Sequence, residues 1–310
     1  MGIAAAACGD GSTTTKPPLV DERIIAFTSD SDNAPQSGGD GTGGSSIFVM
    51  HADGTHKSRL TSPHFLDANP SWSPDGSSIT FESSRTPAGI WIMNADGSNQ
   101  RPLLTDAAFE SPTELRWSPD GHVVAFNAYV NDISNVRVIV IANTDGTHAH
   151  RLTTNATGEQ WPSWSPDGSH IAYMAIAGPI GYSIFVSSAN GSAQQQLTFA
   201  ADGYPAWSPD GAQIAFVNFD DSFHPQIFVV KADGSDRRAL STGGINADPA
   251  WSPDGQQLAF DRNANDSVSS SPREIFRMNA DGSDARAITS FGSVPGAFGS
   301  AWAPAWKPTP

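Results

Sequence analysis

One pentapeptide recurs along this chain and limits the folds that the chain can adopt. Trp-Ser-Pro-Asp-Gly occurs five times, at intervals of 43–47 residues, beginning at Trp72, Trp117, Trp164, Trp207 and Trp251. Because proline fixes φ and glycine supplies a positive φ, each copy predicts a tight turn directly after a tryptophan. A repeat of this period predicts copies of one supersecondary unit, which bury their apolar faces by stacking on one another.

Other motifs recur in a fixed order within the same period. An Ala-Asp-Gly-like turn occurs six times, beginning at Ala52, Ala95, Thr144, Ala189, Ala232 and Ala280. An apolar run that ends in an aromatic residue also occurs six times, ending at Phe27, Phe81, Phe126, Tyr173, Phe216 and Phe260. Short apolar runs between Gly, Pro, Asn and Asp are typical of strands, and helical periodicity is absent. Four strands in about 40–45 residues is the period of a propeller blade.

The ordered motifs Trp-Ser-Pro-Asp-Gly, Ile-Ala-Phe, Asn-Ala-Asp-Gly-Ser and Arg-x-Leu-Thr resemble the repeats of the TolB β-propeller family. The resemblance covers nearly all of residues 23–310. It implies an all-β fold of six four-stranded antiparallel blades around a central channel. We therefore predict one propeller domain over residues 21–310. The α/β domain that precedes the propeller in TolB is not expected in residues 1–20, so the resemblance implies no role in the Tol system.

The number of motifs also predicts how the ring closes. There are six Ala-Asp-Gly-like turns but five complete pentapeptides, and the run that ends at Phe27 has no tryptophan before it. A degenerate sixth copy, Pro304-Ala305-Trp306-Lys307-Pro308, stands at the other end of the chain. We expect the C-terminal strand to be the innermost strand of the first blade, which would remove an open sheet edge.

Residues 1–20 predict a disordered or lipoprotein-like segment and linker. A short apolar run ends in Cys8, the only cysteine of the chain, and a polar stretch with two prolines follows. Small residues before a cysteine resemble the lipobox of bacterial lipoproteins, which implies lipidation at Cys8 and a periplasmic or cell-surface location. The run is short, lacks a basic start and has Ala5 where a leucine is usual, so an inert tail is the alternative. With one cysteine, no intrachain disulfide is possible.

The charge balance narrows the partners. The net charge is −15, from 17 basic and 32 acidic residues. An acidic surface repels phosphate backbones, so nucleic acid is not an expected partner, whereas cations and basic protein surfaces are. We expect a monomer without a cofactor, with Ca²⁺ as the most plausible metal. Asp30-Ser31-Asp32-Asn33 begins like a calcium loop but lacks the later Gly and Glu of an EF-hand.

Functional residues are expected on one face of the propeller. The Ser-Pro-Asp-Gly and Ala-Asp-Gly turns fall on one face, which we name the turn face. The second-to-third-strand loops and the connections between blades fall on the other, the variable face, where the copies differ and binding is more common. Nine residues five or three positions before a repeat tryptophan predict a binding site at the channel mouth: Asp67, Asn69, Glu114, Glu159, Trp161, Asp202, Tyr204, Asn246 and Asp248. The alternative interpretation is that these acids are turn formers that face water.

No catalytic motif accompanies this arrangement. The chain contains neither Gly-x-Ser-x-Gly nor His-Glu-x-x-His, and one cysteine excludes a thiolate cluster. The predicted function is a non-catalytic scaffold that binds a protein or peptide through the variable face and channel mouth. The alternative, suggested by similar propellers among polysaccharide lyases, is a carbohydrate-active lyase or hydrolase at the mouth, with or without a metal, with a glycan stacked on Trp161 and Tyr204.

Overall fold

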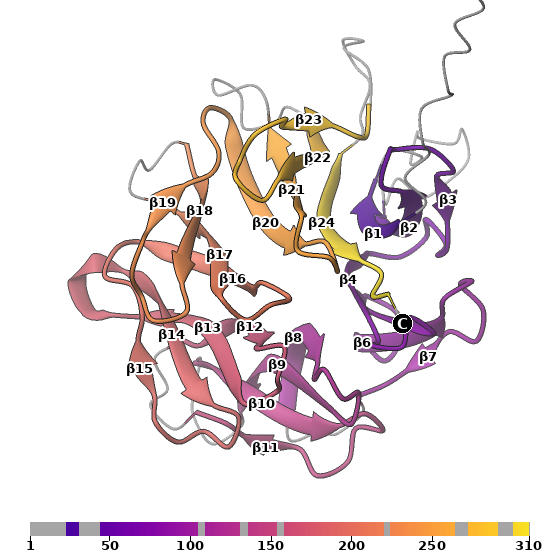
Figure 1. The fold of residues 1–310 in the computed structure, drawn as a ribbon. Helices are drawn as coiled ribbons and strands as arrows, with labels where there is room; N and C mark the ends of the chain where they lie inside the picture. The colour runs from indigo at the N-terminus through magenta and orange to yellow at the C-terminus, as the bar shows by residue number, and fades with distance from the viewer. Residues whose placement is uncertain are drawn as a thin grey trace, which may run out of the picture.

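Six four-stranded antiparallel sheets form a ring in the computed structural model (Figure 1). The structure describes residues 23–30, 44–104, 109–130, 136–153, 158–219, 224–263, 272–290 and 300–309. The six-bladed all-β prediction is therefore confirmed. Residues 1–20, with Cys8, lie outside the described residues, as do residues 31–33 of the calcium-like sequence.

Each blade runs outward from an inner strand through three further strands. Blade 1 contains β24 (Ala301–Trp306), β1 (Ile24–Ser29), β2 (Ser46–His51) and β3 (Ser58–Arg59). Blade 2 contains β4 (Asp67–Trp72), β5 (Ser78–Ser83), β6 (Gly89–Asn94) and β7 (Arg101–Pro102). Blade 3 contains β8 (Phe109–Trp117), β9 (Val123–Val130), β10 (Arg137–Asn143) and β11 (His150–Arg151).

The remaining blades follow the same order. Blade 4 contains β12 (Gln160–Trp164), β13 (His170–Ile176), the short 3₁₀ helix η1 (Gly178–Ile180), β14 (Tyr182–Ser188) and β15 (Gln195–Gln196). Blade 5 contains β16 (Asp202–Trp207), β17 (Gln213–Asn218), β18 (Gln226–Lys231) and β19 (Arg238–Ala239). Blade 6 contains β20 (Ile245–Trp251), β21 (Gln257–Asn263), β22 (Arg273–Asn279) and β23 (Arg286–Ala287).

The ends of the chain close the ring as predicted. The C-terminal β24 pairs antiparallel with β1, with Trp306 opposite Ile25 and Ala305 opposite Ala26 (Figure 1). Trp306 is buried, and its indole N–H donates to the carbonyl of Ala250 in blade 6 at 3.0 Å. The last strand thus completes the first blade and also joins it to the sixth.

The core lies between the blades. The apolar run of each second strand places an aromatic ring in a joint, and Phe27, Phe81, Phe126, Phe216 and Phe260 are fully buried. Each hydrophobic cluster combines residues from two neighbouring blades, as where Phe27 packs with Ile275 of blade 6. Because no blade can bury its face alone, the repeats stabilise one another around the ring.

The pentapeptide forms both a turn and a joint. In its first copy, Ser73 Oγ donates to Asp75 Oδ1 at 2.6 Å, and the amide of Ser78 donates to Ser73 Oγ at 2.9 Å. The tryptophan reaches the blade before it: the indole N–H of Trp164 donates to the carbonyl of Arg116 at 3.3 Å. The repetition therefore reflects a structural requirement at each joint.

Candidate functional site

Every inner strand carries a bulge next to the channel. Three residues before each repeat tryptophan, a residue other than glycine adopts a positive φ: Asn69, Glu114, Trp161, Tyr204, Asp248 and Ala303, with φ between 50° and 58°. At each of these positions the pairing with the second strand slips by one residue. The left-handed region is uncommon for such side chains, and bulges of this kind redirect a side chain.

The six bulges surround a cavity of about 220 Å³ in the channel. All six bulge residues line it, together with the proline that follows most of them and the side chain of Arg116. Five of the nine predicted site residues therefore lie around one space: Asn69, Glu114, Trp161, Tyr204 and Asp248.

Carboxylates and an amide form one side of this cavity. Asn69 Nδ2 donates to Glu82 Oε1 at 2.9 Å and to Glu114 Oε1 at 3.0 Å, and the amide of Glu114 also donates to Glu82 Oε1. Burial, and next the nearby Glu82 charge, raise the pKa of Glu114 well above its usual range. Glu114 Oε2 is buried, and among the described residues no hydrogen-bond donor reaches it. The nearest cation is Arg116, whose Nη2 lies 3.9 Å away.

A second acidic pair lies in blade 6. The buried carboxyls of Asp248 and Asp261 lie close enough to affect each other's pKa. Burial and the charge of Asp248 raise the pKa of Asp261 well above its usual range. Arg273 Nη1 holds Asp261 Oδ2 at 2.8 Å. The channel therefore contains carboxyl groups that favour a proton or another cation.

Aromatic rings from blades 4 and 5 line the cavity between the acidic residues of blades 3 and 6. The ring centroids of Trp161 and Tyr204 are 4.1 Å apart, and Phe219 lies 6.0 Å beyond Tyr204. Burial, and then the charges of Asp248 and Glu114, raise the pKa of the Tyr204 hydroxyl, so it remains a neutral donor. The cavity thus places aromatic rings and carboxylates within one enclosure.

The other four predicted residues do not line the cavity. Asp67, Glu159, Asp202 and Asn246 are buried and absent from its lining. Asn246 Nδ2 donates to several carbonyls, including Gly243 O at 3.1 Å, and Asp202 Oδ1 accepts from Asn218 and Arg237. In a regular strand, positions two apart point to the same side. The bulge adds one residue between them, so the two positions separate. The alternative, acids that face water, does not describe these four residues either.

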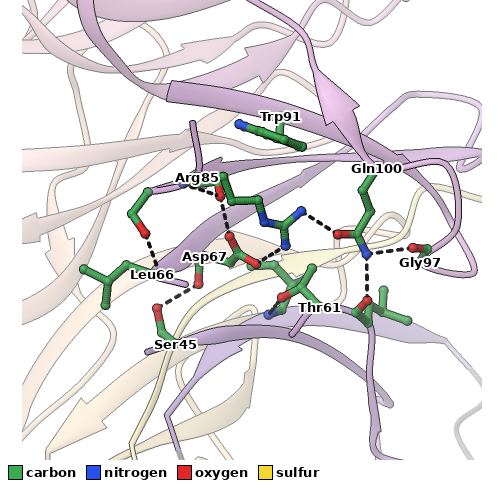
Figure 2. A network of polar contacts seen from close by, with 12 residues as sticks. Ser45, Thr61, Leu66, Asp67, Arg85, Trp91, Gly97 and Gln100 are labelled. Atoms are coloured by element: carbon green, nitrogen blue, oxygen red, sulfur yellow. Dashed lines mark hydrogen bonds and ion pairs between the residues drawn. The ribbon is translucent and has the colours of Figure 1, made fainter. Parts of the chain in front are cut away.

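Figure 2 shows the structural role that one of these residues fills. Asp67 is fully buried; its Oδ1 accepts from Ser83 Oγ and its Oδ2 from Arg85 Nη2, both at 2.6 Å. Arg85 Nη1 also donates to Gln100 Oε1 at 2.6 Å, and Gln100 donates to the carbonyl of Leu60 in the preceding connection. The guanidinium lies 5.0 Å from the ring centroid of Trp91. Asp67 therefore stabilises the joint between blades 1 and 2.

Three channel residues escaped the sequence analysis. Arg116 stands one position before a repeat tryptophan, where the other copies have serine or alanine, so comparison of the repeats could have found it. Glu82 and Asp261 directly follow the aromatic residue of the apolar run in their blades. That position is acidic in these two copies alone, and a comparison of the repeats could have found both residues from this difference.

Some predictions remain beyond the described part of the chain. The second-to-third-strand loops of blades 1 and 6, on the variable face, lie mostly outside it. Within the described residues, no group of three or more His, Cys, Asp or Glu side chains is arranged to hold a metal ion. The same residues include no helix with the length and apolar character that a membrane crossing requires.

Fold and cavity together define a closed six-bladed β-propeller whose channel presents carboxylates and aromatic rings around one cavity. Within that class, the chain belongs to the TolB β-propeller family. The family model described as the TolB beta propeller domain matches residues 39–203 and 139–308.

Individual relatives agree with this assignment. Uncharacterized protein Atu1656 of Agrobacterium fabrum is 34% identical over 142 residues, 41% of this chain and 46% of that protein. A protein TolB homolog of Chlorobium luteolum is 27% identical over 131 residues, 42% of this chain and 28% of that protein. Each match spans less than half of the relative's length. The crystal structure of TolB from Acinetobacter baumannii shares the fold, with a TM-score of 0.76, 18% identity, and coverage of 93% of this chain and 68% of that one.

Proposed function

We propose that this propeller is a non-catalytic scaffold that binds a protein or peptide partner at its channel mouth and variable face. The observation that carries the proposal is the set of six bulges with a positive φ around one cavity. Glycine would adopt this conformation without strain, yet none of the six residues is glycine. Strained positions that keep bulky, chemically different side chains are typical of functional sites. Membership of the TolB family supports a role in protein binding.

The chemistry of the cavity favours a basic side chain of the partner. Glu114 Oε2 lacks a hydrogen-bond donor among the described residues, and Arg116 stays beyond hydrogen-bond distance at 3.9 Å. An arginine or lysine head can donate to this oxygen while its stem or plane lies against Tyr204 or Trp161. The bound arginine or lysine would take the place of the proton on Glu114. The affinity for the basic peptide should therefore rise as Glu114 loses this proton.

The test uses capped peptides that differ only in a central Arg, Lys, Gln or Glu, titrated by calorimetry. We expect the Arg and Lys peptides to bind and the other two to bind at least about tenfold more weakly, since a buried carboxylate discriminates by charge. Glu114→Gln should weaken the Arg peptide by about tenfold or more. A protein partner would then be sought by crosslinking with wild-type protein and the same variant.

Glu110→Gln is the matched control. Glu110 lies on the same strand, β8, but is exposed and does not line the cavity, so its loss removes the same charge without touching the site. Equal binding of the Arg and Glu peptides, or equal effects of the two variants, would contradict the proposal.

A carbohydrate-active lyase or hydrolase is the second candidate. It is favoured by the interacting buried carboxyls of Asp248 and Asp261 and by the aromatic pair Trp161–Tyr204 in the same channel. A carboxyl group with a raised pKa can serve as a general acid, and aromatic rings stack on sugars. Turnover in a polysaccharide screen that Asp248→Asn abolishes would establish this function instead.

A periplasmic or cell-surface location, with a lipid anchor at Cys8, is also part of the proposal. Its support is the lipobox-like sequence and the family. Labelled fatty acid should enter the wild-type chain in cells and not the Cys8→Ser variant. Labelling of both chains or of neither would contradict the anchor.

A further inference from the structure

One joint of the ring differs from the others on the turn face. In each blade, the turn between the third and fourth strands places a glycine over a backbone carbonyl of the preceding blade. An ideal Cβ on five of these glycines would lie 2.2–3.0 Å from that carbonyl oxygen, whereas on Gly234 it would lie 3.3 Å from Leu197 O. By this measure, blades 4 and 5 are packed least closely.

The tryptophan of the same joint lacks a hydrogen bond that three of its counterparts make. Trp164, Trp251 and Trp306 each donate the indole N–H to a carbonyl of the preceding inner strand, at 3.0–3.3 Å. The corresponding N–H of Trp207, which faces blade 4, has no acceptor among the described residues, and the same is true of Trp72 in blade 2. The joint between blades 4 and 5 thus combines the longest glycine-to-carbonyl contact with a tryptophan that lacks this hydrogen bond.

A groove of about 690 Å³ occupies this joint. The corresponding groove between blades 5 and 6 measures about 340 Å³. Apolar groups of Pro166, Val186, Leu197 and Trp207 line the larger groove. None of its lining residues is shared with the channel cavity.

Carboxylates border the groove, and one of them, Asp233, has the cation Lys231 near it. Asp167, Asp210 and Asp233 line it, and no lysine or arginine does. Each carboxylate accepts turn hydrogen bonds through Oδ1, which lower the pKa of all three groups and keep them ionised at neutral pH. No described donor is bonded to their Oδ2 atoms.

Beside this groove, blade 4 also departs from the repeat in its basic residues. After the turn glycine, the other five blades carry at least one lysine or arginine: Lys57 and Arg59, Arg101, Arg151, Arg237 and Arg238, and Arg286. Blade 4 has Gln194, Gln195 and Gln196 instead, and Gln195 lines the groove.

We propose that the groove between blades 4 and 5 is a second docking site, which binds a basic, extended segment of a partner polypeptide. Charge complementarity selects the occupant: arginine or lysine heads meet the three carboxylates, while aliphatic residues and stems cover Trp207 and Leu197. This site lies on the turn face, away from the variable face, and does not depend on the channel.

The test is Gln195→Arg, which gives blade 4 the residue that blades 2, 5 and 6 carry at the same repeat position. The variant should fold normally because the repeat tolerates arginine there. The probe is a capped Leu-Arg-Leu-Arg-Leu peptide, with Leu-Glu-Leu-Glu-Leu as its counterpart. All titrations are made in the Glu114→Gln background, so that the channel does not contribute. We expect the basic peptide alone to bind, and Gln195→Arg to weaken it about tenfold.

Ser58→Arg is the matched control, since exposed Ser58 holds the equivalent position in blade 1 and the variant adds the same charge far from the groove. It should leave peptide affinity unchanged, and Gln195→Glu should raise it about threefold. Equal binding of both peptides, or equal effects of the two arginine variants, would overturn the proposal. So would a failure of the basic peptide to bind in the Glu114→Gln background, because the groove would then not be a binding site of its own.

Discussion

Arg85 provides the most direct test of how two blades are joined. Its guanidinium bonds to the fully buried Asp67 and to Gln100, and it stacks among Phe65, Phe81 and Trp91. Arg85→Ala leaves a buried carboxylate without its cation, and removing one partner of such a pair costs about 3–5 kcal/mol. We therefore expect the free energy of unfolding to fall by that amount at neutral pH.

The loss should depend on pH. Burial raises the pKa of Asp67, against the opposing effects of Ser83 and Arg85. A carboxyl group whose pKa is raised in the folded state stabilises the fold at pH values below its ordinary pKa of 3.8. This contribution is lost as the pH rises through the folded-state pKa. Without Arg85 that pKa rises further. The cost of Arg85→Ala should thus be largest at neutral pH and shrink as the pH approaches 3.8.

Urea denaturation at neutral and mildly acidic pH measures both effects. Asp67→Asn in the Arg85→Ala background should recover part of the loss, because no charge then remains buried. Arg101→Ala is the control, since this arginine is exposed in the same blade and should cost under about 0.5 kcal/mol. A loss below about 1 kcal/mol for Arg85→Ala, or a loss independent of pH, would refute the reasoning.

Three further predictions concern the ring and the channel. Deleting residues 303–310 removes most of β24, so the melting temperature should fall by about 10 °C or more; a truncated chain that melts like wild type would contradict ring closure. Ala303→Gly relieves a positive φ and should add up to about 1 kcal/mol of stability, whereas Ala305→Gly, in the regular part of β24, should cost about 0.5–1 kcal/mol; denaturation midpoints that shift in the same direction would argue against strain. Glu114→Gln should stabilise the fold by about 1 kcal/mol at pH 7, because the raised pKa of Glu114 shows that its charged form is costly in the folded state. Denaturation at a pH below 4.5, the ordinary pKa of a glutamate, should show no gain in stability. A variant that gains nothing at pH 7 would show that the carboxylate is well compensated.

The fold was predictable to a large extent because its information is local. Ser73, Asp75 and Gly76 form their turn through contacts within a few residues, and the same sequence therefore predicts the same turn in every blade. The missing pentapeptide before Phe27 and the remnant at Trp306 were enough to predict ring closure, since each blade needs one inner strand.

The candidate site was predictable only in part. Counting positions before each tryptophan found Glu114 and Tyr204 but also selected Asp67 and Asp202, which pair inside the blades. The error came from the bulge, whose positive φ has no clear sequence signal at residues such as Tyr204.

The sequence by itself determined the number of blades, their turns and the closure of the ring, because the repeat encodes these through short-range contacts. Only the tertiary structure decided which side chains meet. Glu82 and Glu114 belong to different blades and share a hydrogen-bond network through Asn69. Trp207 lacks the carbonyl acceptor that Trp164, Trp251 and Trp306 find. Such contacts depend on how closely neighbouring blades approach, which side-chain volumes and backbone bulges set around the whole ring.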